Sequence, residues 1–129
     1  PAGIVDIEAG AESVMHYSTG VSEHIYHTNH VLAGPLAENR VAASDESSIA
    51  GPNSSRRLAA LARFFERHAK PDLDGVKSLL ASDDGPICAP RVPGQGFTFG
   101  ACIMSLGPQP ILHVAHGPPR TSDFVQHTL

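Results

Sequence analysis

Residues 53–70 read NSSRRLAALARFFERHAK, and the spacing of their apolar side chains predicts an amphipathic helix. Apolar residues recur there at the i, i+3, i+4, i+7 spacing that gathers side chains on one helix face. These residues are Leu58, Leu61, Ala62 and Phe65, and the arginines opposite them are Arg56, Arg63 and Arg67. Asn53 or Ser54 is the expected N-cap, because a side-chain oxygen there accepts from the free amides of the first turn. Pro71 stops the helix.

A second amphipathic helix is predicted directly after Pro71. It starts near Asp72 and carries four apolar side chains on one face, namely Leu73, Val76, Leu79 and Leu80. It ends at the turn-forming sequence Asp83-Asp84-Gly85-Pro86. Because each helix has one apolar stripe, each needs a sheet or another helix to cover it.

Strands are predicted on both sides of the two helices. Residues 3–8, 12–18 and 21–28 are short runs separated by glycine-containing turns, which is typical of an antiparallel meander. Residues 97–106 and 111–116 are two further strands joined by a turn with glycine and proline. The first of these is apolar on both faces, so it is expected to be a central strand covered on both sides. This order of elements indicates an α+β fold with mainly antiparallel sheets, since a parallel sheet would need strands and helices to alternate.

The composition limits the class of protein. At 129 residues the chain has the length of one ordinary domain, so residues 1–129 are expected to form a single domain or a portion of a longer one. The formal net charge is -4 and no basic patch occurs, so neither nucleic acid nor a membrane surface is an expected partner. No apolar run approaches the roughly 18 residues that cross a bilayer, and residues 1–10 lack the pattern of a signal peptide.

The two cysteines indicate a reducing environment. Cys88 and Cys102 do not make a disulfide framework, and neither has the spacing of a zinc site. Cys102 lies inside the apolar run of residues 97–106, where a small buried thiol is expected. We therefore expect a cytoplasmic location.

Eight histidines invite a metal hypothesis, above all His24, His27 and His30 at equal spacing. Three imidazoles with one open position make a catalytic zinc site. On a strand, however, His24 and His30 share a face while His27 points to the other. We therefore expect ordinary polar histidines here, with no metal and no cofactor, and keep a histidine-based metal site on an unrelated α+β fold as an alternative. The sequence also lacks a Gly-x-Ser-x-Gly elbow and a phosphate-binding glycine loop.

The segment His27-Thr28-Asn29-His30 is the strongest candidate for chemistry. An Asn at a strand end can aim its amide N–H into a cleft, and a fixed amide donor is a standard part of an oxyanion hole. The alternative is that Asn29 only caps the strand or forms a turn, which Asn does readily.

Several segments together resemble a known enzyme family, and they occur in the order found in that family. They are Val5-Asp6-Ile7-Glu8-Ala9, His27-Thr28-Asn29-His30, Ser54-x-x-Arg57, Ile87-Cys88, the run from Phe97 to Met104, and Ile111 to Gly117-Pro118. The family is the acyl-coenzyme A:6-aminopenicillanic-acid acyltransferase (isopenicillin N acyltransferase) group, also classed as peptidase family C45. The chain is similar to the C-terminal portion of these longer enzymes.

The resemblance implies a fold and a mechanism. The fold is the αββα sandwich of N-terminal-nucleophile (Ntn) hydrolases, and the reaction is hydrolysis or acyl exchange of a small amide or acyl donor through a thioester. In the family an N-terminal cysteine is the nucleophile and its own α-amino group, with a pKa near about 8, is the base. Asn29 would be the oxyanion-hole donor, with His27, Thr28 and His30 in support. Ser54 and Arg57 would be a helix cap and a structural ion pair.

Two departures from the family pattern shape the expectation. The chain starts at Pro1 and not at a nucleophilic cysteine, so a companion N-terminal segment or subunit is expected to carry the nucleophile, and the chain alone is expected to be inactive. Gln95 stands about where the penicillin-type enzymes carry an arginine, which leaves the penicillin substrate open. The alternative is a catalytically inactive scaffold or small-molecule binding module of the same fold.

Overall fold

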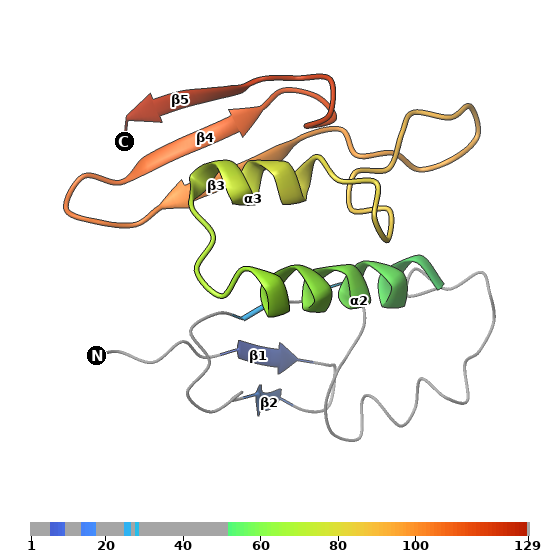
Figure 1. Ribbon diagram of the computed structural model, residues 1–129, viewed down its shortest axis with the longest axis horizontal. Helices are drawn as coiled ribbons and strands as arrows, with labels where there is room; N and C mark the ends of the chain where they lie inside the picture. The colour runs from blue at the N-terminus through green and yellow to red at the C-terminus, as the bar shows by residue number, and fades with distance from the viewer. Residues whose placement is uncertain (1–5, 10–13, 18–24, 27, 29–51, 129) are drawn as a thin grey trace. The chain divides into compact units, whose positions relative to one another are not determined.

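The computed structural model describes residues 6–9, 14–17, 25–26, 28 and 52–128 (Figure 1). The chain divides into two compact units, Pro1–Lys70 and Pro71–Leu129. The described helices and antiparallel sheets make this an α+β protein, as the order of elements predicts.

The first unit contains a two-stranded antiparallel sheet of β1 (Asp6–Ala9) and β2 (Val14–Tyr17). The register runs from Asp6 opposite Tyr17 to Ala9 opposite Val14. Both strands fall within or beside the predicted strands 3–8 and 12–18. Of the predicted strand 21–28, the described residues Ile25, Tyr26 and Thr28 belong to no strand or helix, and the other residues lie outside the described part.

Helix α2 (Pro52–Arg67) belongs to the same unit. It begins at Pro52, and proline suits the first helical position because the amide it lacks would have no partner inside the helix. Asn53 and Ser54 therefore lie within the first turn, and the prediction that one of them is the N-cap is wrong. The predicted faces are confirmed: Arg56, Arg63 and Arg67 are exposed, and the apolar stripe is at least half buried.

The second unit opens with helix α3 (Leu73–Leu80). Asp72 is its N-cap, since the Asp72 carboxylate accepts a hydrogen bond from the amide of Gly75 at 2.8 Å. Leu79 is the buried residue of the helix. The start near Asp72 and the apolar face were both predictable, because the cap residue and the stripe are local features of the sequence.

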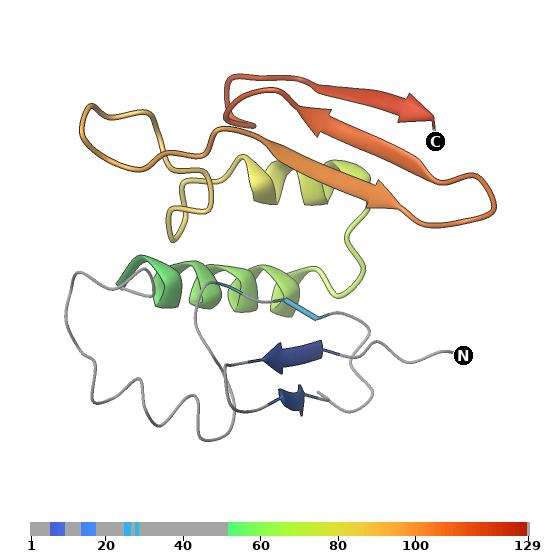
Figure 2. The same cartoon turned by 180° about the vertical axis from the view of Figure 1, so that it is seen from behind.

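A three-stranded antiparallel sheet follows in the same unit. It consists of β3 (Ala101–Ser105), β4 (Ile111–Ala115) and β5 (Phe124–Thr128), in that spatial order (Figures 1 and 2). Ile103 lies opposite His113, and His113 lies opposite Gln126. Strand β5 was not predicted from the sequence, although its five residues include β-branched and aromatic side chains.

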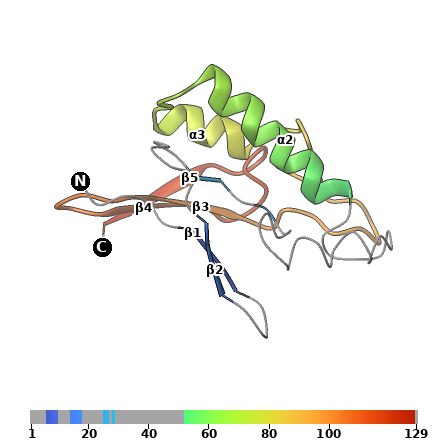
Figure 3. The same ribbon diagram turned by 90° about the horizontal axis from the view of Figure 1, so that it is seen from below.

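The two faces of this sheet differ. Figure 3, which shows the sheet nearly edge-on, places α3 on one side of it. On that covered face Ala115 is 1% exposed and His113 is 5% exposed. Successive residues of a strand point to opposite faces, so the register defines the other face, here called the open face. Its residues are Cys102, Met104, Leu112, Val114, Val125 and His127.

The open face corrects two predictions. Residues 97–106 were expected to be a central strand covered on both sides, but β3 starts only at Ala101 and lies at the side of the described sheet. Cys102 was expected to be buried, but it is exposed, and Met104 beside it is 53% exposed. An apolar run predicts that both faces of a strand are covered, but it does not identify the segment that covers each face. In the described part of the chain, one face of β3 is left open.

The connection from α3 to β3 is held by backbone hydrogen bonds. The amide of Cys88 donates to the carbonyl of Ser82 at 2.8 Å, and Cys88 itself is only 1% exposed. Further along, the Ala89 amide donates to the Thr98 hydroxyl at 3.0 Å, and the Thr98 amide donates to the Ala89 carbonyl at 3.1 Å. These reciprocal bonds close the loop that contains Gly94, whose φ of 76° lies in the region that favours glycine.

Candidate functional site

Thr28 is the one residue of the His27-Thr28-Asn29-His30 segment that the structure describes. His27, Asn29 and His30 lie outside the described residues, as does His24. The geometry of the candidate site is therefore built from Thr28, its neighbours Ile25 and Tyr26, and the helix that contacts them.

Ser54 connects this segment to α2. Its hydroxyl donates a hydrogen bond to the Thr28 hydroxyl oxygen at 3.1 Å, across 26 positions of sequence. Ser54 is 1% exposed and Thr28 is partly exposed, so the bond is partly buried. A buried hydroxyl without a hydrogen-bond partner costs free energy, because it loses its hydration and gains nothing in return. The bond to Thr28 is therefore expected to stabilise the fold. The Ser54 hydroxyl therefore makes a tertiary contact that its sequence position does not suggest.

Tyr26 provides a second contact between the segment and α2. Its ring stacks on Phe65 with centroids 5.3 Å apart and planes 5° apart. Phe65 meets Phe64 edge to face, and Phe64 stacks on His68 with centroids 4.6 Å apart. Aromatic pairs with such geometry stabilise a contact beyond the area they bury. Tyr26 and Thr28 are two positions apart, which is the spacing of one side of an extended chain.

Arg57 lies one helical turn after Ser54. Its Nε atom is buried and makes no hydrogen bond with the part of the chain that the structure describes. The structural ion pair expected of Arg57 stays a prediction. The Ser54-x-x-Arg57 pattern thus places a buried hydroxyl and a partly buried guanidinium on the same side of α2.

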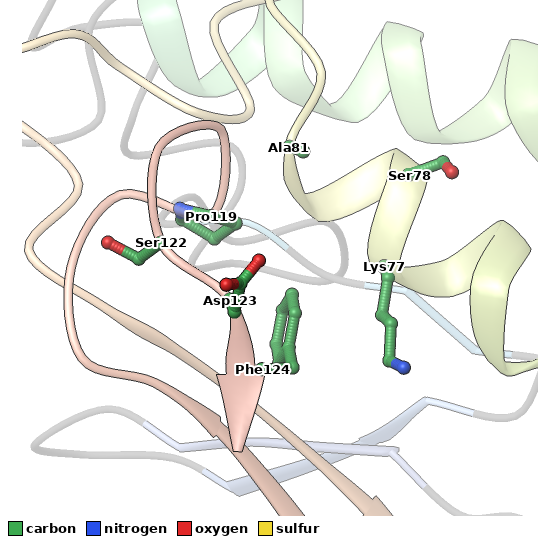
Figure 4. Close-up of a pocket in the computed structure, with 7 residues that line it drawn as sticks. All are labelled: Lys77, Ser78, Ala81, Pro119, Ser122, Asp123 and Phe124. Carbon is green, nitrogen blue, oxygen red and sulfur yellow. The ribbon is translucent and has the colours of Figure 1, made fainter.

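A shallow hollow of about 370 Å³ opens in the second unit, between α3 and the connection from β4 to β5 (Figure 4). Its lining is made of Lys77, Ser78, Ala81, Pro119, Ser122, Asp123 and Phe124. In Figure 4 the Phe124 ring stands between the Asp123 carboxylate and the Lys77 side chain. The hollow therefore combines one aromatic ring with charges of both signs. It was not predicted, because its two walls are about forty positions apart in the sequence.

Arg120 holds this connection against the end of α3. Its Nε donates to the carbonyl of Ala81 at 3.3 Å, and its guanidinium lies 3.6 Å from the carboxylate of Asp83. A cation at the C-terminal end of a helix is also favoured by the helix dipole. Lys77 across the hollow lies 3.5 Å from the carboxylate of Asp74.

Two properties of the described residues bear on function. No group of three or more His, Cys, Asp or Glu side chains there is arranged to hold a metal ion. No helix among those residues combines the length and the apolar character needed to cross a membrane. Cys88 and Cys102 are both free thiols, the first buried and the second exposed.

Comparison with known proteins gives no match. No family model matches this chain, and no significant match is found among curated proteins or solved structures. The class that the structure defines is therefore an α+β protein with antiparallel sheets.

Proposed function

We propose that this chain is the C-terminal part of a cysteine Ntn amidohydrolase or acyltransferase, with Asn29 as an oxyanion-hole donor. The observation that carries the proposal is the hydrogen bond from Ser54 to Thr28. It joins two of the segments on which the family resemblance rests, His27-Thr28-Asn29-His30 and Ser54-x-x-Arg57. The proposal requires these two segments to lie together in the folded chain, and the contact meets that requirement.

The layering of the second unit also supports the proposal. A sheet with a helix on one face and apolar residues on the other is what half of an αββα sandwich needs. Met104 and Val125 on the open face are 53% and 48% exposed. Contiguous exposed apolar side chains mark surfaces that another element covers. A companion N-terminal segment or subunit that carries the nucleophile is therefore part of the proposal.

The proposed reaction runs through a thioester. The α-amino group of the N-terminal cysteine takes the proton of its own thiol, and the sulfur attacks the carbonyl carbon of a small amide. The carbonyl oxygen becomes an oxyanion, which Asn29 stabilises by donating its amide N–H. The C–N bond then breaks, and the leaving amine takes the proton. Water, or a second amine in acyl exchange, attacks the thioester and releases the acyl group together with the regenerated thiol.

The first test is Asn29→Ala in the full protein. Loss of one oxyanion-hole donor is expected to lower kcat on the order of 100-fold, because the donor acts where charge develops in the transition state. Amide hydrolysis is measured with a panel of small acylated amines. Asn53→Ala is the matched control, since Asn53 is an exposed asparagine in the first turn of α2 and has no role in the proposed reaction. Unchanged kcat in Asn29→Ala would leave Asn29 as a turn residue only.

A second candidate function is a small-molecule binding module without catalysis. The hollow lined by Lys77, Asp123 and Phe124 favours it, because a concave site with a ring and a few polar groups is the usual form of a ligand site. Intact-mass and N-terminal analysis of the protein from its full gene separates the two candidates. An exposed N-terminal cysteine supports the enzyme, and its absence supports the binding module. The proposal includes a cytoplasmic location, which agrees with two free thiols.

A further inference from the structure

Two exposed histidines come together beside the open face of the sheet. His116 directly follows β4, and His127 lies in β5 on the open face. Their ring centroids are 6.3 Å apart and their planes are 76° apart. His127 is opposite Leu112 in the register, so the Val114–Val125 pair lies between the two histidines along the ladder. Their rings are nevertheless close, which means that the two side chains lean toward each other.

The fold itself does not explain this approach. Both residues are exposed, so neither ring is part of the core. Within the described residues, the interaction that involves their rings is the contact with each other. The two rings make an edge-to-face contact of the ordinary kind, which is worth little at an exposed position. The pair has the nitrogen lone pairs that a cation would use.

We infer that His116 and His127 form a binding site for a divalent transition-metal ion of the zinc, nickel or copper type. Imidazole nitrogen suits these ions, whereas magnesium and calcium prefer oxygen. Two imidazoles on one tetrahedral ion, with metal–nitrogen distances of about 2.0 to 2.1 Å, have ring centroids about 5 Å apart. The observed 6.3 Å is wider by about 1 Å, so the inference requires the two exposed side chains to move closer together when the ion binds.

The protein supplies two ligands, and water completes the coordination. No third His, Cys, Asp or Glu joins these rings in the described part of the chain. A site with two protein ligands and open positions exchanges its metal readily, unlike a closed structural zinc site. The inference concerns different histidines from His24, His27 and His30, and it is independent of the proposed amidohydrolase function.

Calorimetric titration of the untagged full chain with Zn²⁺ tests the inference. The variants are His116→Gln, His127→Gln, and the two combined. The matched control is His68→Gln, because His68 is an exposed histidine whose ring stacks on Phe64 and donates from Nδ1 to the Phe64 carbonyl. Since other histidines contribute their own binding, the quantity compared is the difference between each variant and the unchanged chain.

One shared site has a clear signature. Each single variant is expected to weaken one Zn²⁺ binding event about tenfold or more. Loss of a residue that only hydrogen-bonds to a metal ligand already lowers metal affinity by about that factor, and loss of a ligand should cost at least as much. The double variant is expected to lose the same event and no other, and His68→Gln to keep it. Zn²⁺ should also raise the Tm of the unchanged chain more than that of the variants. If His116→Gln or His127→Gln binds Zn²⁺ like the unchanged chain, with the same rise in Tm, the site does not exist.

Discussion

At the scale of single residues, the bond between Ser54 and Thr28 carries more structural information than any other contact described for the first unit. Both residue types are ordinary at a helix start and a strand end, and the sequence favours a capping role for Ser54. In the structure the helix starts two positions earlier, and the Ser54 hydroxyl turns to Thr28 at 3.1 Å. Whether a serine hydroxyl near a helix start also bonds to a distant segment depends on which segment packs beside the helix. The local sequence does not contain that information.

The Ser54–Thr28 bond can be measured by a double-mutant cycle. Ser54→Ala and Thr28→Val each remove one partner from a site that is 1% exposed at Ser54. Each is expected to lower the free energy of unfolding by about 1 to 3 kcal/mol, because the remaining hydroxyl loses a buried partner. Urea unfolding of the single and double variants gives the coupling.

The double variant shows whether the two hydroxyls act together, because its stability loss is compared with the sum of the two single losses. Its loss should be smaller than the sum of the single losses by about 0.5 to 1.5 kcal/mol, the net contribution of one hydrogen bond. Additive losses would mean that the two hydroxyls act separately, and the contact would then no longer support the proposed link between the two motifs.

At the scale of elements, the second helix was predictable almost to the residue, whereas the third strand of its sheet was not. Asp72 is an N-cap by residue type and position, and its carboxylate does accept from the Gly75 amide. Strand β5 needs β4 beside it to form, since a single short strand has no partners for its backbone groups. Helices are stabilised by hydrogen bonds within one segment, so their sequence signals are stronger.

The cap of α3 gives a prediction at this scale. Asp72→Ala is expected to lower the free energy of unfolding by about 1 kcal/mol, because the Gly75 amide loses its acceptor. Asp72→Asn should restore most of the loss, since asparagine caps a helix as well as aspartate does. Thermal or urea unfolding measures both.

A charge effect would give a different result for the asparagine variant. If Asp72→Asn is as unstable as Asp72→Ala, the interaction of the carboxylate with the helix dipole outweighs the hydrogen bond. Asp74→Ala is the useful comparison, because Asp74 is an exposed acid in the same first turn that makes a 3.5 Å contact with Lys77 and does not cap the helix.

At the scale of the whole molecule, the second unit has one face of its sheet buried and the other largely open. Ala115 on the covered face is 1% exposed, whereas Val125, on the neighbouring strand and the opposite face, is 48% exposed. Composition and periodicity alone cannot distinguish these faces, because both carry apolar residues. The difference arises because α3 lies on one side of the sheet (Figure 3).

The two faces should respond differently to small changes of side chain. Ala115→Val is expected to destabilise the chain by about 1 to 3 kcal/mol, because two extra methyl groups do not fit a filled site. Val125→Thr, on the open face, should stay within about 0.5 kcal/mol of the unchanged chain. Urea unfolding of both variants makes the comparison.

The same pair of variants tests whether the open face is covered in the assembled protein. If a companion segment packs there, Val125→Thr should weaken that association, because it places a hydroxyl in an apolar contact. Equal stability losses for the two variants in the isolated chain would show instead that both faces are already filled.

The sequence by itself determined the two helices, their apolar faces, the Asp72 cap, the hairpin of β3 and β4, and the α+β class, because each depends on residues close together in the chain. It also suggested the Asn29 hypothesis. Only the tertiary structure decided that Ser54 bonds to Thr28, that β5 completes the sheet, that Cys102 is exposed, and that His116 meets His127. These features depend on which distant segments come together, and the free energy of such contacts belongs to no single stretch of sequence.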